Sequence, residues 1–155
     1  MRQWRRGLYV HWQRQFLHPM MKAFDGPRRE ECTAQRAKSN TPLAALTLLN
    51  DPTFVEAARA FATRILDAGG SSDDERLDVA FRLALSRKPD EFESQILTRL
   101  LAESRKGFSA SKESAQQLVS TGQAPVDNTH SAAELAAWTT VARAILNLNE
   151  TNTRN

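Results

Sequence analysis

Apolar residues recur at three- and four-residue spacing along most of the chain after residue 40. This spacing puts apolar side chains on one face of a helix and therefore predicts amphipathic helices. The four clearest helices cover residues 52–68, 73–86, 91–107 and 132–148. A weaker pattern predicts a short helix within residues 109–122. Residues 43–49 are apolar nearly all round, so we expect this short helix to be buried.

Helix start signals mark a corner near the end of the first third of the chain. Thr41 followed by Pro42 is typical of an N-cap with proline at the first helical position, where the missing N–H costs nothing. Asp51 followed by Pro52 repeats this signal, and Pro52 disfavours helical geometry in the residue before it. The sequence therefore predicts a tight helical corner. Its motif residues are Asn40, Thr41, Pro42, Asn50, Asp51 and Pro52.

The helical periodicity also separates expected core positions from expected solvent positions. In residues 52–68 the apolar face carries Phe54, Ala58, Phe61 and Ile65. The opposite, polar face carries Glu56, Arg59 and Asp67. In residues 91–107 a wide apolar face carries Phe92, Ile96, Leu97, Leu100 and Leu101. In the last helix, Trp138 is best interpreted as a core anchor, with stacking against a ligand as the alternative.

These patterns favour an all-α domain of five or six helices, packed as antiparallel hairpins around residues 43–49. Residues 41–150 form the expected helical body. Residues 1–40 form a basic, aromatic arm and loop, which we expect to be the tail end of a larger domain. Residues 151–155 contain no apolar side chain and are expected to fray.

Charge is distributed unevenly between the arm and the body. Residues 1–40 hold nine Lys/Arg against three Asp/Glu, whereas the rest of the chain holds twelve against fifteen. A basic arm on a mildly acidic body could meet nucleic acid, an anionic surface or another protein domain. The domain contact is the preferred interpretation, and nucleic-acid binding is disfavoured.

The first part of the arm combines aromatic and basic side chains. Trp4, Leu8, Trp12 and Phe16 recur at helical spacing, whereas Leu8, Val10 and Trp12 alternate as in a strand, and both readings stay open. Arginine beside aromatic rings can stack bases or sugars, but packing against a preceding part of the domain is preferred. The predicted binding residues are Trp4, Tyr9, Trp12, Arg28, Arg29 and Arg36.

The loop before the helical corner holds the most chemically mixed residues of the chain. Asp25, Arg29 and Cys32 are the candidate catalytic residues, with Cys32 as a thiolate activated by neighbouring arginines. A buried structural cysteine is the preferred interpretation. Because Cys32 is the only cysteine, an intrachain disulfide, a zinc–cysteine cluster and a haem c attachment motif are excluded. No metal-ligand spacing occurs, and His130 is expected to be a solvated loop residue.

Three stretches carry a resemblance to a known family: Ala23–Cys32, Ser39–Phe54 and Ala80–Pro89. With gaps, the likeness runs from Arg5 to Asn149, and it resembles the C-terminal domain of unknown function in large planctomycete proteins. Those proteins commonly carry a planctomycete-type cytochrome c domain near their N-terminus. The resemblance implies an exported or periplasmic protein and places any haem c in an upstream domain, with no cofactor in this chain.

No apolar run reaches the length of a membrane span, and the N-terminus lacks the apolar region of an export signal. Since the family implies export, we expect this chain to be the C-terminal piece of a longer protein. The predicted function is a non-catalytic helical interaction or scaffold module of a larger exported multidomain protein. Its expected partners are upstream domains of the same polypeptide or another exported protein. The alternative is part of an enzyme that acts on an extracellular polymer such as a polysaccharide.

Overall fold

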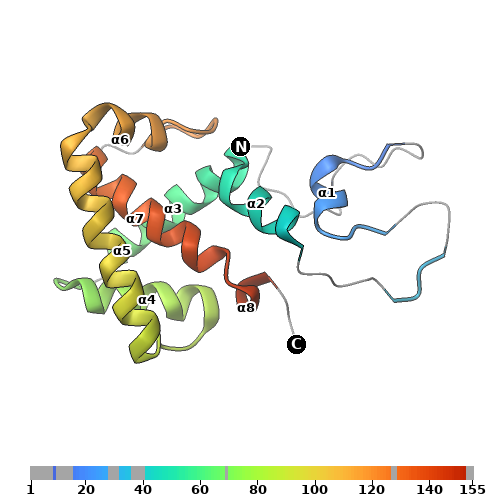
Figure 1. Cartoon of the computed structure of the whole chain (residues 1–155), viewed down its shortest axis with the longest axis horizontal. Helices are drawn as coiled ribbons and strands as arrows, with labels where there is room; N and C mark the ends of the chain where they lie inside the picture. Colours follow the sequence, from blue (N-terminus) through green and yellow to red (C-terminus); the bar gives the residue numbers. More distant parts are fainter. Residues whose placement is uncertain are drawn as a thin grey trace.

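The computed structural model describes residue 9 and residues 16–27, 32–35, 41–68, 70–126 and 129–152. Within these ranges the chain is all-helical, as the sequence predicts, and strands are absent from them. The helices are α1 (Pro19–Ala23), α2 (Pro42–Asn50), α3 (Pro52–Ala68), α4 (Asp73–Leu85), α5 (Glu91–Ala110), α6 (Lys112–Val119), α7 (Ala132–Leu146) and α8 (Asn149–Asn152). In Figure 1, α3 to α8 form the body and α1 and α2 project from its right-hand side.

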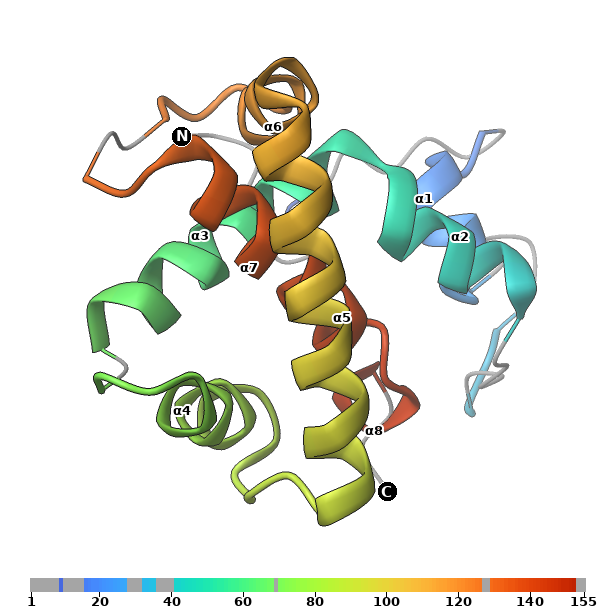
Figure 2. The same cartoon turned by 60° about the vertical axis from the view of Figure 1, so that its left-hand side comes forward.

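Helix α7 lies at the centre of the body, where it packs against α3, α5 and α6. Figure 2 shows α5 crossing in front of α7, with α6 above and α4 below. Helix α7 is apolar over most of its surface and supplies Trp138, the largest buried side chain in the described part of the chain, which has no exposed surface. The indole Nε1 of Trp138 donates a hydrogen bond to Oε1 of Glu134 at 3.0 Å, so burial leaves no unpaired donor on the ring.

The helix boundaries follow the start signals of the sequence. Ser72 and Glu75 form a capping box at α4, and Asp90 and Glu93 form another at α5. The Ser131 hydroxyl accepts a hydrogen bond from the Glu134 N–H at the start of α7. Each cap pairs backbone donors that the first helical turn would otherwise leave unsatisfied.

Two short helices lie where the sequence predicts loop or tail. Helix α1 falls in a segment expected to be a loop because of its prolines, yet Pro19 stands at the start of the helix, where proline is tolerated. The His18 side chain accepts a hydrogen bond from the Met20 N–H and caps this turn. In α8, the Thr151 hydroxyl donates to the Ile145 carbonyl and fixes the turn onto the end of α7. Residues 151 and 152, assigned to the tail, are therefore helical.

The place of α2 differs from the prediction that the helices pack around it. The large core cluster contains residues of α3 to α7 and none of α2. Only Ala44 of α2 is buried. The helix was expected to be buried because it is apolar nearly all round, but it lies at the edge of the body and covers α3 and α7 with one face.

The predicted polar face of α3 is partly buried, which corrects the sequence interpretation of Glu56 and Arg59. The Glu56 side chain is 2% exposed and accepts hydrogen bonds from the N–H groups of Gln123 and Ala124. Arg59 is 4% exposed and donates to the carbonyls of Val119 and Ala124. The loop after α6 therefore lies on this face of α3 and has its backbone groups satisfied there.

Gly122 stands in the loop that covers Glu56. Its φ of +103° is one that residues with a side chain rarely adopt, and a Cβ there would approach Glu56 Cβ to 2.7 Å. Glycine at this position therefore allows the loop to lie close against α3.

Candidate functional site

The best-defined candidate surface is built on α2 and the corner that follows it. The Thr41 hydroxyl accepts a hydrogen bond from the Ala44 N–H at 3.2 Å, and Pro42 is the first helical residue. At the other end, Asp51 leaves helical geometry with a ψ of 129°. Its Oδ1 accepts from the Thr53 N–H at 2.8 Å and caps α3. The two helices are thus joined by a single non-helical residue.

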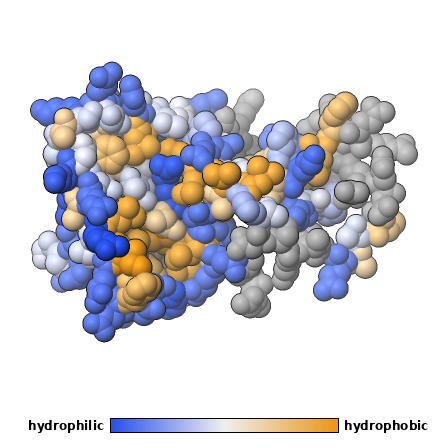
Figure 3. Space-filling view, in the orientation of Figure 1, coloured by the Kyte–Doolittle hydropathy of each residue, from blue (hydrophilic) through white to orange (hydrophobic). Residues whose placement is uncertain are grey.

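The outer face of α2 is apolar and exposed. Four of the nine residues of this helix are leucines. Two of them are largely exposed: Leu43 is 61% exposed and Leu46 is 56% exposed. No residue of α2 carries a charge. Figure 3 shows the resulting patch of orange side chains over α2, beside the bluer surface of α1. Contiguous exposed apolar patches of this kind mark interaction sites more often than scattered single residues do.

The inner side of α2 is fixed to the body by contacts at its C-terminal end. The Arg143 guanidinium, from α7, donates a hydrogen bond to the Leu49 carbonyl at the end of α2. Next to the corner, the ring of Phe54 packs edge-on against Phe24 with ring centroids 5.6 Å apart. The exposed leucines therefore stand on a helix whose position is set by α1, α3 and α7.

The predicted binding residues of the arm fall largely outside the described residues. Trp4, Trp12, Arg28, Arg29, Arg36 and the motif residue Asn40 are all in this group. Tyr9 is described and is 63% exposed, and Phe16, at the end of the same stretch, is 73% exposed. Their predicted part in binding stays a prediction, but the two described rings are open to contact.

The structure describes two of the three candidate catalytic residues, and the catalytic role of all three stays a prediction. Arg29 lies outside the described residues, whereas Cys32 is exposed, contrary to the buried position preferred from sequence. Asp25 adopts a φ of 54° just after Phe24, the C-cap residue of α1, and the Gly26 N–H donates a hydrogen bond to the Met21 carbonyl. A left-handed residue at a helix C-terminus is a common way to end a helix, so this conformation has a structural reason.

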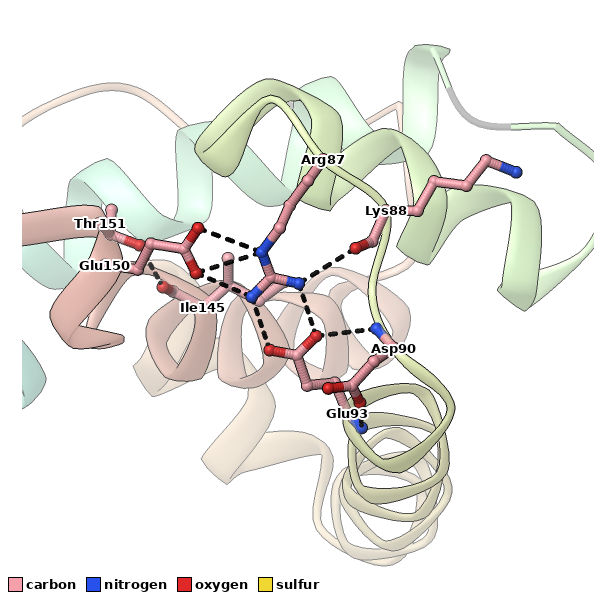
Figure 4. A network of polar contacts seen from close by, with 7 residues as sticks. All are labelled: Arg87, Lys88, Asp90, Glu93, Ile145, Glu150 and Thr151. Carbon is pink, nitrogen blue, oxygen red and sulfur yellow. Dashed lines mark hydrogen bonds and ion pairs between the residues drawn. The ribbon is translucent and has the colours of Figure 1, made fainter.

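A charged cluster around Arg87 joins three elements of the body (Figure 4). Its guanidinium donates to both oxygens of Glu93 at 2.7 Å, to Glu150 of α8 at 2.8 Å, and to the Lys88 carbonyl at 3.0 Å. The guanidinium also lies over the Phe81 ring, 5.3 Å from the centroid. The hydrogen bonds from Arg87 lower the pKa of Glu93 and of Glu150. Glu93 and Glu150 are thus both paired with Arg87, and the cluster fixes α8 to the α4–α5 loop.

A second cluster joins the N-terminal turns of α4 and α7 through Arg105 of α5. Arg105 donates to Asp73 at 2.8 Å and to Glu134 at 2.9 Å. These hydrogen bonds lower the pKa of both carboxyl groups, and the Trp138 N–H adds a smaller contribution at Glu134. Because Glu134 also accepts a hydrogen bond from the buried indole of Trp138, the cluster connects the apolar core with polar side chains near the surface. Sequence periodicity could not predict it, since its members lie on three helices.

These clusters predict a loss of stability in acid that depends on Arg105. Asp73 and Glu134 have depressed pKa values in the folded chain. Their contribution to the free energy of unfolding is therefore complete above their unfolded pKa values, near 3.8 and 4.5. This contribution is lost as the pH falls through their folded pKa values. We expect the free energy of unfolding, measured by urea denaturation, to fall below about pH 5. Arg105→Gln should lower stability at neutral pH and flatten this dependence. An equally steep acid dependence in Arg105→Gln would contradict this assignment.

His130 does not stand alone in the loop before α7. Its Nε2 lies 2.9 Å from Oδ1 of Asp67, at the end of α3. In the described part of the chain, no group of three or more His, Cys, Asp and Glu side chains is arranged to hold a metal ion. In the same residues, no helix is both long and apolar enough to cross a membrane.

The fold and the surface together define an all-helical domain that carries an exposed, uncharged helix at one edge. Comparison with protein families assigns the chain to a family. It belongs to the family described as protein of unknown function (DUF1553), whose family model matches residues 1–101. The match includes α1 to α4 and ends within α5, so the central helix α7 lies beyond the matched residues. No curated protein and no solved structure matches the chain.

Proposed function

We propose that this chain is a non-catalytic helical interaction or scaffold module of a larger exported, planctomycete-type multidomain protein. It docks through the outer face of α2 onto a preceding domain of the same polypeptide. The observation that carries the proposal is the exposure of Leu43 and Leu46 on a helix that is held in place from behind.

The chemistry of this face favours a protein surface as its partner. Helix α2 carries no charged residue, so it offers no cationic side chain to pair with phosphates or with an anionic surface. Burying an exposed leucine side chain is worth about 1.5–3 kcal/mol, and this gain requires an apolar partner. An apolar helix that is buried on both faces is the arrangement that its composition predicts.

The position of α2 in the chain supports a preceding domain as the occupant. The helix directly follows residues 1–40, the arm that we interpret as the tail end of a larger domain. Tyr9 and Phe16 lie within that arm, before α2 in the chain, and their exposed rings add aromatic surface. Any haem c group would belong to an upstream domain, because this chain contains one cysteine and lacks the attachment motif.

Changing both exposed leucines of α2 tests this proposal. We expect Leu43→Glu/Leu46→Glu to weaken binding of the 155-residue chain to the separately expressed preceding part of the same gene product by roughly 100-fold or more, since two apolar side chains lose their burial. Isothermal titration calorimetry gives the affinity, and circular dichroism verifies that the helix content is retained.

Leu83→Glu is the matched control for the docking experiment. Leu83 is 47% exposed and belongs to α4, a helix that lies apart from α2 in Figure 1. The control should bind as the unchanged chain does. Equal affinities for the double variant and the unchanged chain, or an equal loss with Leu83→Glu, would rule out docking through α2.

A further inference from the structure

Helix α5 carries a second apolar face that the fold leaves exposed. Phe92 is 71% exposed and Ile96 is 40% exposed, whereas Leu97 and Leu101 on the inner face are buried. The sequence pattern assigned all four to one wide apolar face directed into the core. Helix α5 packs against α7, and its side that carries Leu97 and Leu101 belongs to the core, whereas Phe92 and Ile96 stay outside it. Figure 3 shows orange side chains at the lower left of the surface, over the first half of α5.

Charged residues flank this apolar pair along the helix. Glu91 and Arg99 are eight residues apart and are both exposed. Phe92, Ile96 and Arg99 follow the spacing of four and three residues that places side chains on one helix face. Glu91 comes one residue before Phe92 and lies at the edge of this face, so the order along the outward side of α5 is negative, apolar, apolar and positive. A partner helix with the opposite order, running antiparallel, would match both charges.

We propose that this face binds a second copy of the chain through antiparallel packing of two α5 helices. A two-fold axis near Gln95 places Glu91 of each copy beside Arg99 of the other, because both residues are four positions from Gln95. Phe92 and Ile96 of the two copies then cover one another between these ion pairs. The charge order of the face is thus complementary to itself in this orientation. This contact is separate from the α2 face and goes beyond the proposed docking function.

Sedimentation equilibrium of the full 155-residue chain tests the contact. We expect a concentration-dependent mass that approaches twice 17.4 kDa. Phe92→Ser should raise the dimer dissociation constant at least tenfold, while circular dichroism shows an unchanged helix content. A chain that stays monomeric up to ~1 mM, or a dimer that Phe92→Ser does not weaken, would overturn the proposal.

Charge exchange tests the antiparallel register. Glu91→Arg and Arg99→Glu should each weaken the dimer, since each places like charges together in both symmetry-related pairs. The double variant Glu91→Arg/Arg99→Glu restores opposite charges, and its dissociation constant should return to that of the unchanged chain. A double variant that is as weak as the single variants would overturn the register.

A cysteine at the proposed axis gives an independent readout. In a Cys32→Ser background, Gln95→Cys should form a disulfide-linked dimer under mild oxidation, because residue 95 of one copy meets residue 95 of the other. Thr98→Cys is the matched control: it is exposed on the same helix, but three residues from the axis, beyond the reach of a disulfide with its own copy. Equal cross-linking at both positions would contradict the axis.

Discussion

Replacing Trp138 by alanine is expected to lower the free energy of unfolding by about 3–5 kcal/mol. Among the described residues this side chain is the largest that is fully buried, and it belongs to α7, the helix against which α3, α5 and α6 pack. Its loss would leave a cavity in the centre of the body and would remove the hydrogen bond to Glu134. Chemical denaturation followed by circular dichroism measures the change.

Two further variants make the interpretation of Trp138 specific. Trp138→Phe keeps most of the apolar volume but removes the indole N–H, so we expect it to cost less than the alanine variant. Leu83→Ala removes apolar atoms from a side chain that is 47% exposed and should change stability little. If Trp138→Ala proved no more destabilising than Leu83→Ala, the placement of α7 at the centre of the core would be wrong.

Replacing Arg59 by methionine is the second change with a large expected effect. Arg59 is 4% exposed and donates to the carbonyls of Val119 and Ala124. Methionine retains apolar volume but donates no hydrogen bond, and each buried carbonyl left unpaired costs about 1–3 kcal/mol. We expect the loop after α6 to loosen, with a lower free energy of unfolding and faster amide exchange in residues 119–124.

Arg64→Met is the matched control for Arg59→Met. Arg64 lies on the same helix, α3, but it is exposed, so the identical change there should shift the free energy of unfolding only slightly. Equal effects of the two variants would mean that the contacts of Arg59 with the loop contribute nothing to stability.

The starts of the main helices could be predicted from sequence because the signals are local, whereas α5 continues to Ala110, past the predicted end at residue 107. Pro42 and Pro52 each begin a helix, and Ser72 and Asp90 each close a capping box within three residues. Periodicity also identified Trp138 as a core residue. Caps and apolar stripes depend on neighbours in the chain, and a single sequence contains these neighbours.

The positions of the exposed faces could not be predicted, because they depend on which elements meet in space. Glu56 and Arg59 are buried by a loop more than sixty residues further along the chain. Leu46 and Phe92 are apolar residues on predicted core faces, and among the described residues they remain exposed. A helical stripe shows that a residue can be buried, whereas the surface that covers it is a property of the whole fold or of a partner.

The family match and the structure address different parts of the problem. The match to residues 1–101 includes both apolar faces, on α2 and on the first half of α5. The helix that organises the core, α7, lies beyond it. The candidate surfaces therefore lie within the family-matched residues. Some residues that position them lie beyond residue 101, as Arg143 does for α2.

Site-specific photo-cross-linking at Leu46 tests the central claim most directly. A photoreactive amino acid replaces Leu46 in the native gene, the cells are irradiated, and the cross-linked peptides are identified by mass spectrometry, with Leu83 as the control position. Docking through α2 predicts that position 46 links to peptides of a preceding domain of the same polypeptide and that position 83 does not. Native protein of 17.4 kDa, with no such cross-link at position 46, would contradict the claim.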